Sequence, residues 1–317
     1  MSKNKQIALT GATGFIGNTL LSQLTNAGWC VRALYRPKKG RTPPPALANV
    51  QWVAGDIHDQ EAVKALVKDT YAVIHCAGVV RGASREDFDY VNEEGARRVA
   101  LAAAQAGTAR FLLISSLAAR MPDLSYYAAS KQRGEASLKS VASNMRWTIL
   151  RPPAVYGPGD RELLPLFQSM AKGFAPLPAN ANGRFSMIYV VDLAAAMVQW
   201  LHADAGDGNT FELDDGCANG YDWDAVLDIA SKVLRPAKGK ILRVPIPVSI
   251  LKLVANINLG ASQVLKYAPM LTPGKVREIT HSDWVCDNDQ VTQVIGWQPA
   301  FSFERGLASI FDNNLKA

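Results

Sequence analysis

The chain has 317 residues, of which 48% are hydrophobic and 20% are charged, and its net charge is +6. This composition supports a large buried core and excludes a mainly disordered protein, and the length suits one α/β domain with a smaller lobe. The basic excess does not predict nucleic-acid binding, because only residues 36–41 concentrate Lys and Arg.

Short apolar runs alternate with helical patterns in the first half of the chain. Strand-like runs occupy 7–9, 30–34, 50–53, 71–75, 110–115 and 147–150, and helical patterns occupy 18–28, 60–67, 88–106 and 127–141. Runs that are apolar throughout are typical of parallel strands covered on both faces. This order predicts an α/β fold, a doubly wound parallel Rossmann sheet with helices on both faces.

The texture of the sequence changes after Arg151. Residues 151–163 and 174–186 are rich in Pro, Gly and Asn and predict loops, followed by a strand at 187–191, a helix at 192–202 and a strand at 211–213. From Gly220 onward, helices with short connections predict a smaller lobe. We therefore expect a nucleotide-binding domain over 1–155, to which 187–215 returns, and a substrate-binding lobe formed by 156–186 and 216–317.

The most membrane-like segment is 244–260. Prolines interrupt its start, Lys252 its middle, and Asn256 and Asn258 its end, so the uninterrupted part is too short to span a bilayer. We expect an amphipathic helix of the lobe in preference to a membrane-surface anchor, and no membrane span.

The cysteines and the N-terminus bear on the compartment. Cys30, Cys76, Cys217 and Cys286 form no C-x-x-C pair, so we expect reduced thiols and no metal site. The N-terminus lacks the pattern of a signal peptide. These observations predict a cytoplasmic protein.

A glycine-rich turn, TGATGFIG, directly follows the first apolar run. Gly11, Gly14 and Gly17 permit a tight turn and a close approach of the backbone to a pyrophosphate. The N-terminus of the next helix then offers unpaired N–H groups to the anion. The turn therefore predicts a dinucleotide phosphate site.

Further motifs follow this turn in a fixed order. They are GDI at 55–57, HCAG at 75–78, Asn92 in YVNEEG, SS at 115–116, YAASK at 127–131, RPPAVYGPGD at 151–160, YVVDLA at 189–194 and GWQP at 296–299. Over most of the chain the series resembles the extended short-chain dehydrogenase/reductase family, which contains nucleotide-sugar epimerases, hydroxysteroid dehydrogenases and dihydroflavonol reductases. The resemblance implies an NAD(P)-dependent oxidoreductase with a small-molecule substrate, often a homodimer.

The resemblance also implies which residues bind the cofactor. Asp56 and Ile57 would flank the adenine, Ala77 and Gly78 would line the cofactor channel, and 151–155 would lie near the nicotinamide. The full expected set is Gly11, Thr13, Gly14, Phe15, Ile16, Gly17, Arg36, Asp56, Ile57, Ala77, Gly78, Tyr127, Lys131 and Pro153.

The end of the second predicted strand indicates which nicotinamide cofactor is used. Enzymes that use NAD commonly place an acid there for the ribose 2′-hydroxyl, whereas an arginine suits a 2′-phosphate. The stretch VRALYRPKKGR has Arg36 and no acid, and Lys38, Lys39 and Arg41 would add positive charge. The stretch predicts NADP(H) rather than NAD(H), although a solvated basic loop remains open.

Two adjacent tyrosines compete for a catalytic role. Residues four apart share a helix face, so Tyr127 faces Lys131, whereas Tyr126 faces Ser130. A neighbouring ammonium favours the phenolate and should lower the pKa of Tyr127 toward neutrality. We predict that Tyr127 is the acid or base and that Lys131 assists it; the resemblance gives Lys131 the nicotinamide ribose hydroxyls as a second task.

A serine pair closes the fifth predicted strand, at the sheet edge where ligands bind. The family's strand pattern places the catalytic hydroxyl at Ser116, with Ser115 as the second choice. With Tyr127, this hydroxyl would stabilise charge that develops on the substrate oxygen.

The substrate is only weakly indicated. Sugar-nucleotide members carry a longer loop before the tyrosine, and the position of their diphosphate-binding arginine holds Phe185, with Arg184 one residue earlier. Phe185, Met187 and the apolar segment 244–259 favour an apolar carbonyl or alcohol. The alternatives are a nucleotide-sugar epimerase or dehydratase and a regulatory protein that senses NADP(H) without catalysis.

Overall fold

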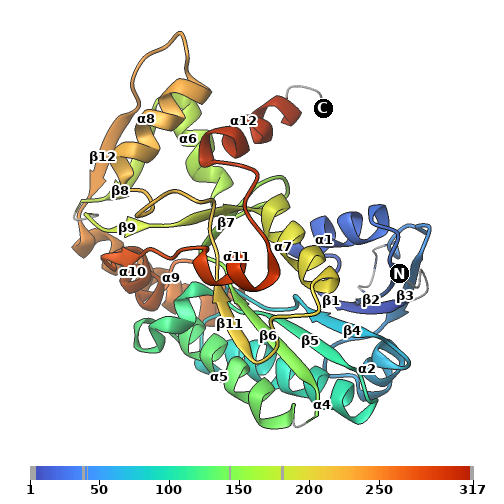
Figure 1. Cartoon of the computed structure of the whole chain (residues 1–317). Helices are drawn as coiled ribbons and strands as arrows, with labels where there is room; N and C mark the ends of the chain where they lie inside the picture. The colour runs from blue at the N-terminus through green and yellow to red at the C-terminus, as the bar shows by residue number, and fades with distance from the viewer. Residues whose placement is uncertain (1–4, 38–39, 41, 143, 180–181, 315–317) are drawn as a thin grey trace.

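A seven-stranded sheet forms the centre of the protein (Figure 1). The computed structural model describes the backbone of residues 5–37, 40, 42–142, 144–179 and 182–314. The strands are β1 (Gln6–Thr10), β2 (Cys30–Tyr35), β3 (Val50–Ala54), β4 (Ala72–His75), β5 (Arg110–Ile114), β6 (Arg146–Arg151) and β11 (Asn209–Glu212). Their order is β11-β6-β5-β4-β1-β2-β3, and all pairs are parallel. The predicted doubly wound Rossmann fold is confirmed.

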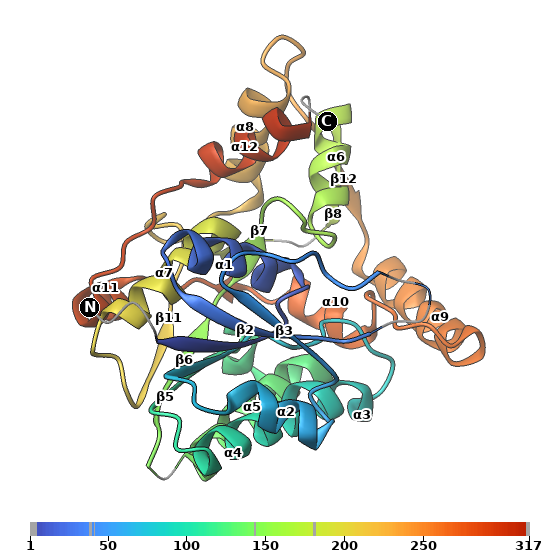
Figure 2. The same cartoon turned by 90° about the vertical axis from the view of Figure 1, so that its right-hand side faces the viewer.

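Helices cover both faces of this sheet (Figure 2). The face that receives Ile7 and Leu9 of β1 is covered by α1 (Phe15–Asn26) and α7 (Val190–His202). The opposite face, which receives Ala8, is covered by α2 (Gln60–Val67), α4 (Ala96–Gln105) and α5 (Tyr126–Val141). Both sides of the central strands β1, β4 and β5 are therefore dry, which explains why their sequences are mainly apolar. The edge strand β3 has no fully buried residue.

The single helix predicted over 88–106 is divided into three parts. They are α3 (Arg85–Phe88), a π-helical segment η1 (Asp89–Gly95) and α4. Helix α5 approaches this segment so closely that a Cβ on Gly134 would lie 2.3 Å from the Asn92 carbonyl oxygen. The π-helical turn therefore lies at the point where the two helices are in backbone contact. π-Bulges of this kind are frequent at functional sites.

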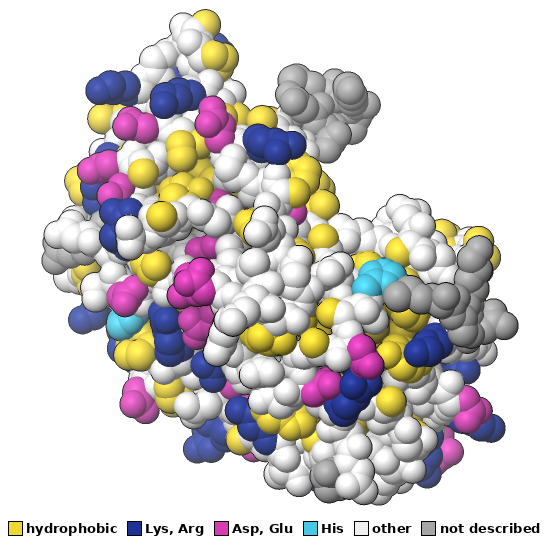
Figure 3. All heavy atoms as spheres, in the orientation of Figure 1, with side chains coloured by type: hydrophobic (Ala, Val, Ile, Leu, Met, Phe, Trp, Pro, Cys, Tyr) yellow, Lys and Arg dark blue, Asp and Glu magenta, His cyan; other side chains and the backbone are white. Residues whose placement is uncertain are grey.

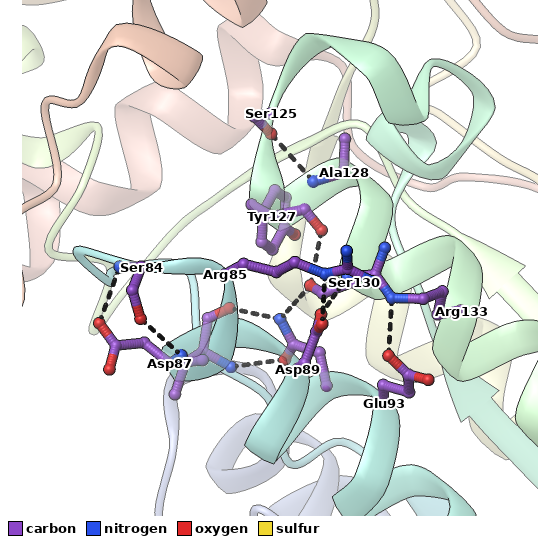
Figure 4. Close-up of polar contacts among 12 residues, drawn as sticks. Ser84, Arg85, Asp87, Asp89, Glu93, Ser125, Tyr127, Ala128, Ser130 and Arg133 are labelled. Atoms are coloured by element: carbon purple, nitrogen blue, oxygen red, sulfur yellow. Dashed lines mark hydrogen bonds and ion pairs between the residues drawn. The ribbon is translucent and has the colours of Figure 1, made fainter.

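Ion pairs fasten α5 to the same segment (Figure 4). Arg133 of α5 pairs with Asp89 and, at 2.6 Å, with Glu93. Arg85 contacts Asp89 at 3.0 Å, so one carboxylate holds arginines from two helices. These contacts fix the orientation of the helix that carries Tyr127.

Outside the central sheet, the described residues form three short parallel ribbons and a further core, and we call this part the lobe. The ribbons pair β7 (Ala154–Tyr156) with β10 (Met187–Tyr189), β8 (Phe174–Pro178) with β12 (Leu242–Ile246), and β9 (Arg184–Phe185) with β13 (Asp283–Trp284). The core lies among α6 (Leu164–Lys172), α8 (Trp223–Leu234) and α12 (Phe303–Asn314). The prediction of loops throughout 151–163 and 174–186 was wrong, because pairing with distant segments makes strands of proline-containing sequence.

Three further helices complete the chain: α9 (Val248–Leu265), α10 (Pro273–Ile279) and α11 (Asp289–Ile295). Val291 and Ile295 of α11, with Trp297, pack into the sheet core on the α1 and α7 side. The division into 1–155 with 187–215 and 156–186 with 216–317 stays a prediction, and so does the homodimer.

Candidate active site

The glycine turn fits the phosphate group of a dinucleotide. Gly11 has a φ of +71°, and a Cβ on Gly17 would lie 2.1 Å from the Gly11 carbonyl oxygen. Gly14 caps α1 without a side-chain hydrogen bond, and the first turn carries no acidic residue. The N-terminus of α1 therefore keeps unpaired N–H groups that can bind an anion. A side chain at Gly17 would collide with the backbone of the turn. The turn also contains Thr13, Phe15 and Ile16.

Arg36 and Asp56 lie together beyond the ends of β2 and β3. Their Nη1 and Oδ2 atoms are 3.4 Å apart, and the arginine side chain is 65% exposed. Asp56 also accepts a hydrogen bond from the His58 N–H at 3.1 Å. Arg36 thus remains available to a ligand, since an exposed pair of this kind is weak. Lys38, Lys39 and Arg41 lie outside the described residues.

The two serines that follow β5 have different partners. The buried Ser115 hydroxyl donates to Glu135 Oε1 at 2.5 Å. The Ser116 side chain lies near enough to the Tyr127 hydroxyl to lower the pKa of that tyrosine. Ser116 Oγ also accepts from the Ala118 N–H at 3.2 Å, at the start of the 3₁₀ turn η2 (Leu117–Arg120). The structure therefore brings Ser116, and not Ser115, to the tyrosine.

Tyr127 is protonated at neutral pH. Burial raises the pKa of Tyr127 to about 12, although the hydrogen bond with Ser116 lowers it, and the Glu278 carboxylate adds to the rise. The phenol ring packs edge-on against Phe88 with centroids 6.1 Å apart. This direction differs from the expected lowering because the apolar surroundings oppose the charged phenolate more than neighbouring groups support it.

Lys131 is buried below the tyrosine on α5. Its Nζ donates to the Ile114 carbonyl at 2.7 Å. Burial lowers the pKa of Lys131 to about 8, against the opposing effect of the Glu135 carboxylate. A Cβ on Gly78 would lie 3.6 Å from this nitrogen, so the amine lies beside Ala77 and Gly78, the expected wall of the cofactor channel.

Asn92 secures the loop that follows this wall. Its side-chain oxygen accepts from the Val79 N–H at 2.9 Å, and its amide donates to the Val79 carbonyl at 3.0 Å and to Ser130 Oγ at 2.9 Å. Ser130 in turn donates to the Tyr127 carbonyl at 2.7 Å (Figure 4). One amide thus connects η1, the channel wall and the tyrosine helix.

Pro153 is half-buried just beyond β6, on the segment expected near the nicotinamide. The neighbouring Pro152 carbonyl accepts from the Leu117 N–H at 2.8 Å, which joins the segment to the residue after Ser116. The expected nicotinamide segment and the serine therefore share one edge of the sheet.

A cavity of about 180 Å³ lies in front of Tyr127. Its walls combine apolar side chains with charged ones, among them Val80, Phe88, Tyr126, Leu259, Met270, Lys275, Arg277 and Glu278. Tyr126, whose ring is 57% exposed, therefore borders the cavity beside Tyr127.

Of the residues expected near the substrate, Leu259 at the end of the apolar segment 244–259 lines the cavity, whereas Phe185, Met187 and Arg184 lie elsewhere. Phe185 packs against Trp223 with ring centroids 4.8 Å apart, and Met187 is buried in the lobe core. Arg184 donates to the Asn219 and Gly220 carbonyls at 2.7 and 2.9 Å. Its guanidinium is thus held within the lobe and does not line the cavity.

Helix α10 contributes residues that the sequence did not reveal. Glu278 is buried and hydrogen-bonded by Ser125, the residue that caps α5 through the Ala128 N–H at 2.9 Å (Figure 4). Lys275 pairs with Glu278 at 2.8 Å and lies 5.9 Å above the Tyr127 ring centroid. No motif marks these positions, because they meet the tyrosine only through tertiary packing.

Comparisons with known proteins agree with this fold. The model of the NAD dependent epimerase/dehydratase family matches residues 7–213. A ceramide reductase from Caulobacter vibrioides is 39% identical, over 88% of this chain and 85% of its own. A UDP-glucose 4-epimerase from Vibrio cholerae is 24% identical, over 96% and 93%. The solved structure of MoeE5 with UDP-glucuronic acid and NAD is 19% identical, covers 99% of both chains and has a TM-score of 0.75.

Proposed function

The chain belongs to the NAD-dependent epimerase/dehydratase family, and from this premise we propose that it is an NADP(H)-dependent reductase of a ketone in a ceramide-class lipid. That it is an NAD(P)-dependent enzyme follows from the family. The observation that carries the finer proposal is the buried Tyr127, which lies beside Ser116 and lines a partly apolar cavity. The similarity to a ceramide reductase over most of both chains supports the substrate class.

We propose the following roles for the site. The Ser116 and Tyr127 hydroxyls hold the substrate carbonyl oxygen, and Tyr127 donates the proton that turns this oxygen into a hydroxyl. Lys131 holds the ribose hydroxyls and keeps positive charge near the phenol. The glycine turn binds the pyrophosphate, and Arg36 binds the 2′-phosphate. The reduced nicotinamide, when bound, supplies the hydride.

The direct test is an assay of the purified protein with NADPH and two substrates. Oxidation of NADPH with a ketone-bearing ceramide, and the appearance of the corresponding alcohol by mass spectrometry, would support the proposal. Epimerisation of UDP-glucose without net NADPH oxidation would contradict it and favour the nucleotide-sugar alternative, for which Lys275 and Arg277 at the cavity would be the cations. Cofactor binding without either reaction would favour the regulatory alternative.

Arg36 provides a test of the cofactor preference. Arg36→Ala should weaken NADP(H) binding about 10- to 100-fold, the effect of one charge-assisted contact, and leave NAD(H) binding nearly unchanged. Calorimetric titration with both cofactors measures the difference. Lys64→Ala, which removes a similarly exposed cation on α2, is the control. Equal small effects of Arg36→Ala on both cofactors would contradict the NADP(H) assignment.

The pH dependence should follow Lys131. Burial lowers the pKa of Lys131 to about 8 and raises that of Tyr127 to about 12, so of these two groups only the lysine changes charge between pH 6 and 10. The amine is charged below pH 8, so kcat/KM for NADPH should be constant there and fall above it. Lys131→Arg keeps its charge and should remove this alkaline fall. A fall with an unchanged midpoint in the variant would show that another group titrates.

A further inference from the structure

Helix α9 projects from the body of the lobe (Figure 2) and exposes apolar side chains. Leu253 is 60% exposed, Ile257 62%, Val264 80% and Leu265 71%. Among the described residues it is the one helix long and apolar enough to cross a membrane, but only 11% of it is buried inside the protein. The expectation of an ordinary amphipathic helix therefore leaves this exposed face unexplained.

The side chains of α9 divide into three sectors. At 100° per residue, the side chains that turn toward the protein surround Ala255 and Ser262, which are buried. Ser249, Lys252, Asn256 and Gln263 form an adjoining polar sector. The remaining sector spans about 120° and is apolar; it comprises Ile250, Leu253, Val254, Ile257, Val264 and Leu265. An apolar arc beside a polar one suits a helix that lies in a membrane interface.

The surface continues beyond the helix in both directions. Leu242 of β12 is 68% exposed, and Val244 on the same strand is also exposed. Beyond the other end of α9, Tyr267 is exposed, and its hydroxyl donates to the Asn258 carbonyl at 3.1 Å. An aromatic ring with one polar end is typical of the boundary between lipid and water.

The charge of this region complements an anionic surface. On the face shown in Figure 3, basic and acidic side chains are interspersed. Residues 229–277, which include β12, α9 and most of α10, contain no Asp or Glu. The cations on β12, on α9 and directly after α9 are Arg243, Lys252 and Lys266, of which Arg243 pairs with Asp224 at 3.4 Å. Basic residues near an anionic bilayer each contribute about 1 kcal/mol to binding.

From the three sectors, and from the absence of acidic residues on β12 and α9, we infer that α9 docks flat on an anionic phospholipid bilayer. The helix does not cross the bilayer, because one sector packs on the protein and both ends return to it. Asn258 fixes this arrangement by donating to the Leu271 carbonyl at 2.8 Å. The inward side of α9 also carries Leu259, which lines the cavity in front of Tyr127. The docked surface thus adjoins the mouth of the candidate active site.

The first experiment measures binding to vesicles by sedimentation. The full chain should bind vesicles of phosphatidylcholine with phosphatidylglycerol at least tenfold more tightly than vesicles of phosphatidylcholine alone, and added salt should weaken that binding. The triple variant Leu253→Ser, Ile257→Ser, Leu265→Ser should lose at least tenfold in affinity. The control variant Leu47→Ser replaces an exposed leucine outside α9, and it should bind vesicles as tightly as the unaltered protein does.

A second measurement separates lipid docking from the other occupants and from the proposed function. Light scattering gives the mass of the parent and of the triple variant without vesicles, and both should have the same mass. A parent that does not bind vesicles overturns the inference, and a parent of larger mass than the triple variant assigns the face to a second copy. Titration with NADPH checks that the triple variant is folded, and vesicle binding needs no turnover, so failure of the proposed reaction leaves this result intact.

Discussion

Tyr127→Phe should reduce turnover by about 10²- to 10⁴-fold, the usual contribution of a positioned acid. The variant removes the hydroxyl that lies beside Ser116 and would donate the proton, but keeps the ring that packs against Phe88. Because the phosphate turn and Lys131 are untouched, the dissociation constant of NADPH should change by less than about threefold. Single-turnover oxidation of NADPH and a fluorescence titration measure the two quantities.

Tyr126→Phe is the matched control for this variant. Tyr126 borders the same cavity, but the residue is 57% exposed, and Ser116 lies beside the neighbouring Tyr127 instead. Loss of the Tyr126 hydroxyl should change KM more than kcat, because this hydroxyl can contact a substrate but does not lie beside Ser116. Substantial turnover in Tyr127→Phe, or equal losses in both variants, would remove Tyr127 from the proposed role.

Glu135→Gln should destabilise the protein by about 3 kcal/mol, at the lower end for breaking a buried pair. The Glu135 side chain is 3% exposed and accepts from Arg151 at 2.6 and 2.8 Å and from Ser115 at 2.5 Å. The amide keeps the shape but leaves the half-buried guanidinium without its main counter-charge. Thermal unfolding monitored by circular dichroism should show a midpoint several degrees lower.

The same change should reach the active site through Lys131. The Glu135 carboxylate raises the pKa of the lysine, so its loss lowers that pKa further and moves the alkaline fall of kcat/KM to lower pH. Glu93→Gln is the control, because Glu93 pairs with Arg133 in a more exposed position and should cost under about 1 kcal/mol. Equal midpoints for the two variants would contradict a structural role for the buried carboxylate.

The part of the fold that follows from the sequence is the part made of local repeating units. The six strands from β1 to β6 lie within a residue of the apolar runs, and α2 begins and ends as expected at Gln60 and Val67. The lobe strands could not be found this way. Phe174–Pro178 reads as a loop, and it becomes a strand only through Leu242–Ile246, more than sixty residues later.

The residues of the candidate site also fall into two groups, those that local sequence patterns predict and those that only tertiary contacts reveal. The glycine turn and the spacing of Tyr127 and Lys131 are local, and the structure places them as the sequence implied. The functional roles of these residues stay predictions. The choice between Ser115 and Ser116 could be checked only in three dimensions, because it depends on Glu135 occupying one of the two hydroxyls. Glu278 is beyond sequence reasoning, since it reaches the tyrosine helix across more than 140 residues of chain.

The seventh strand has a consequence for how the chain folds during synthesis. β11 pairs with β6 in the register Thr210 to Ile149, and β8 and α6 of the lobe lie between them in the sequence. Until the ribosome has released residues up to the end of β11, β6 is an unpaired edge strand with apolar side chains. Thr148 of this strand later receives the Trp200 indole N–H at 2.9 Å. Fragments that stop before residue 209 should therefore aggregate, and the sheet is complete only when the chain has returned from the lobe.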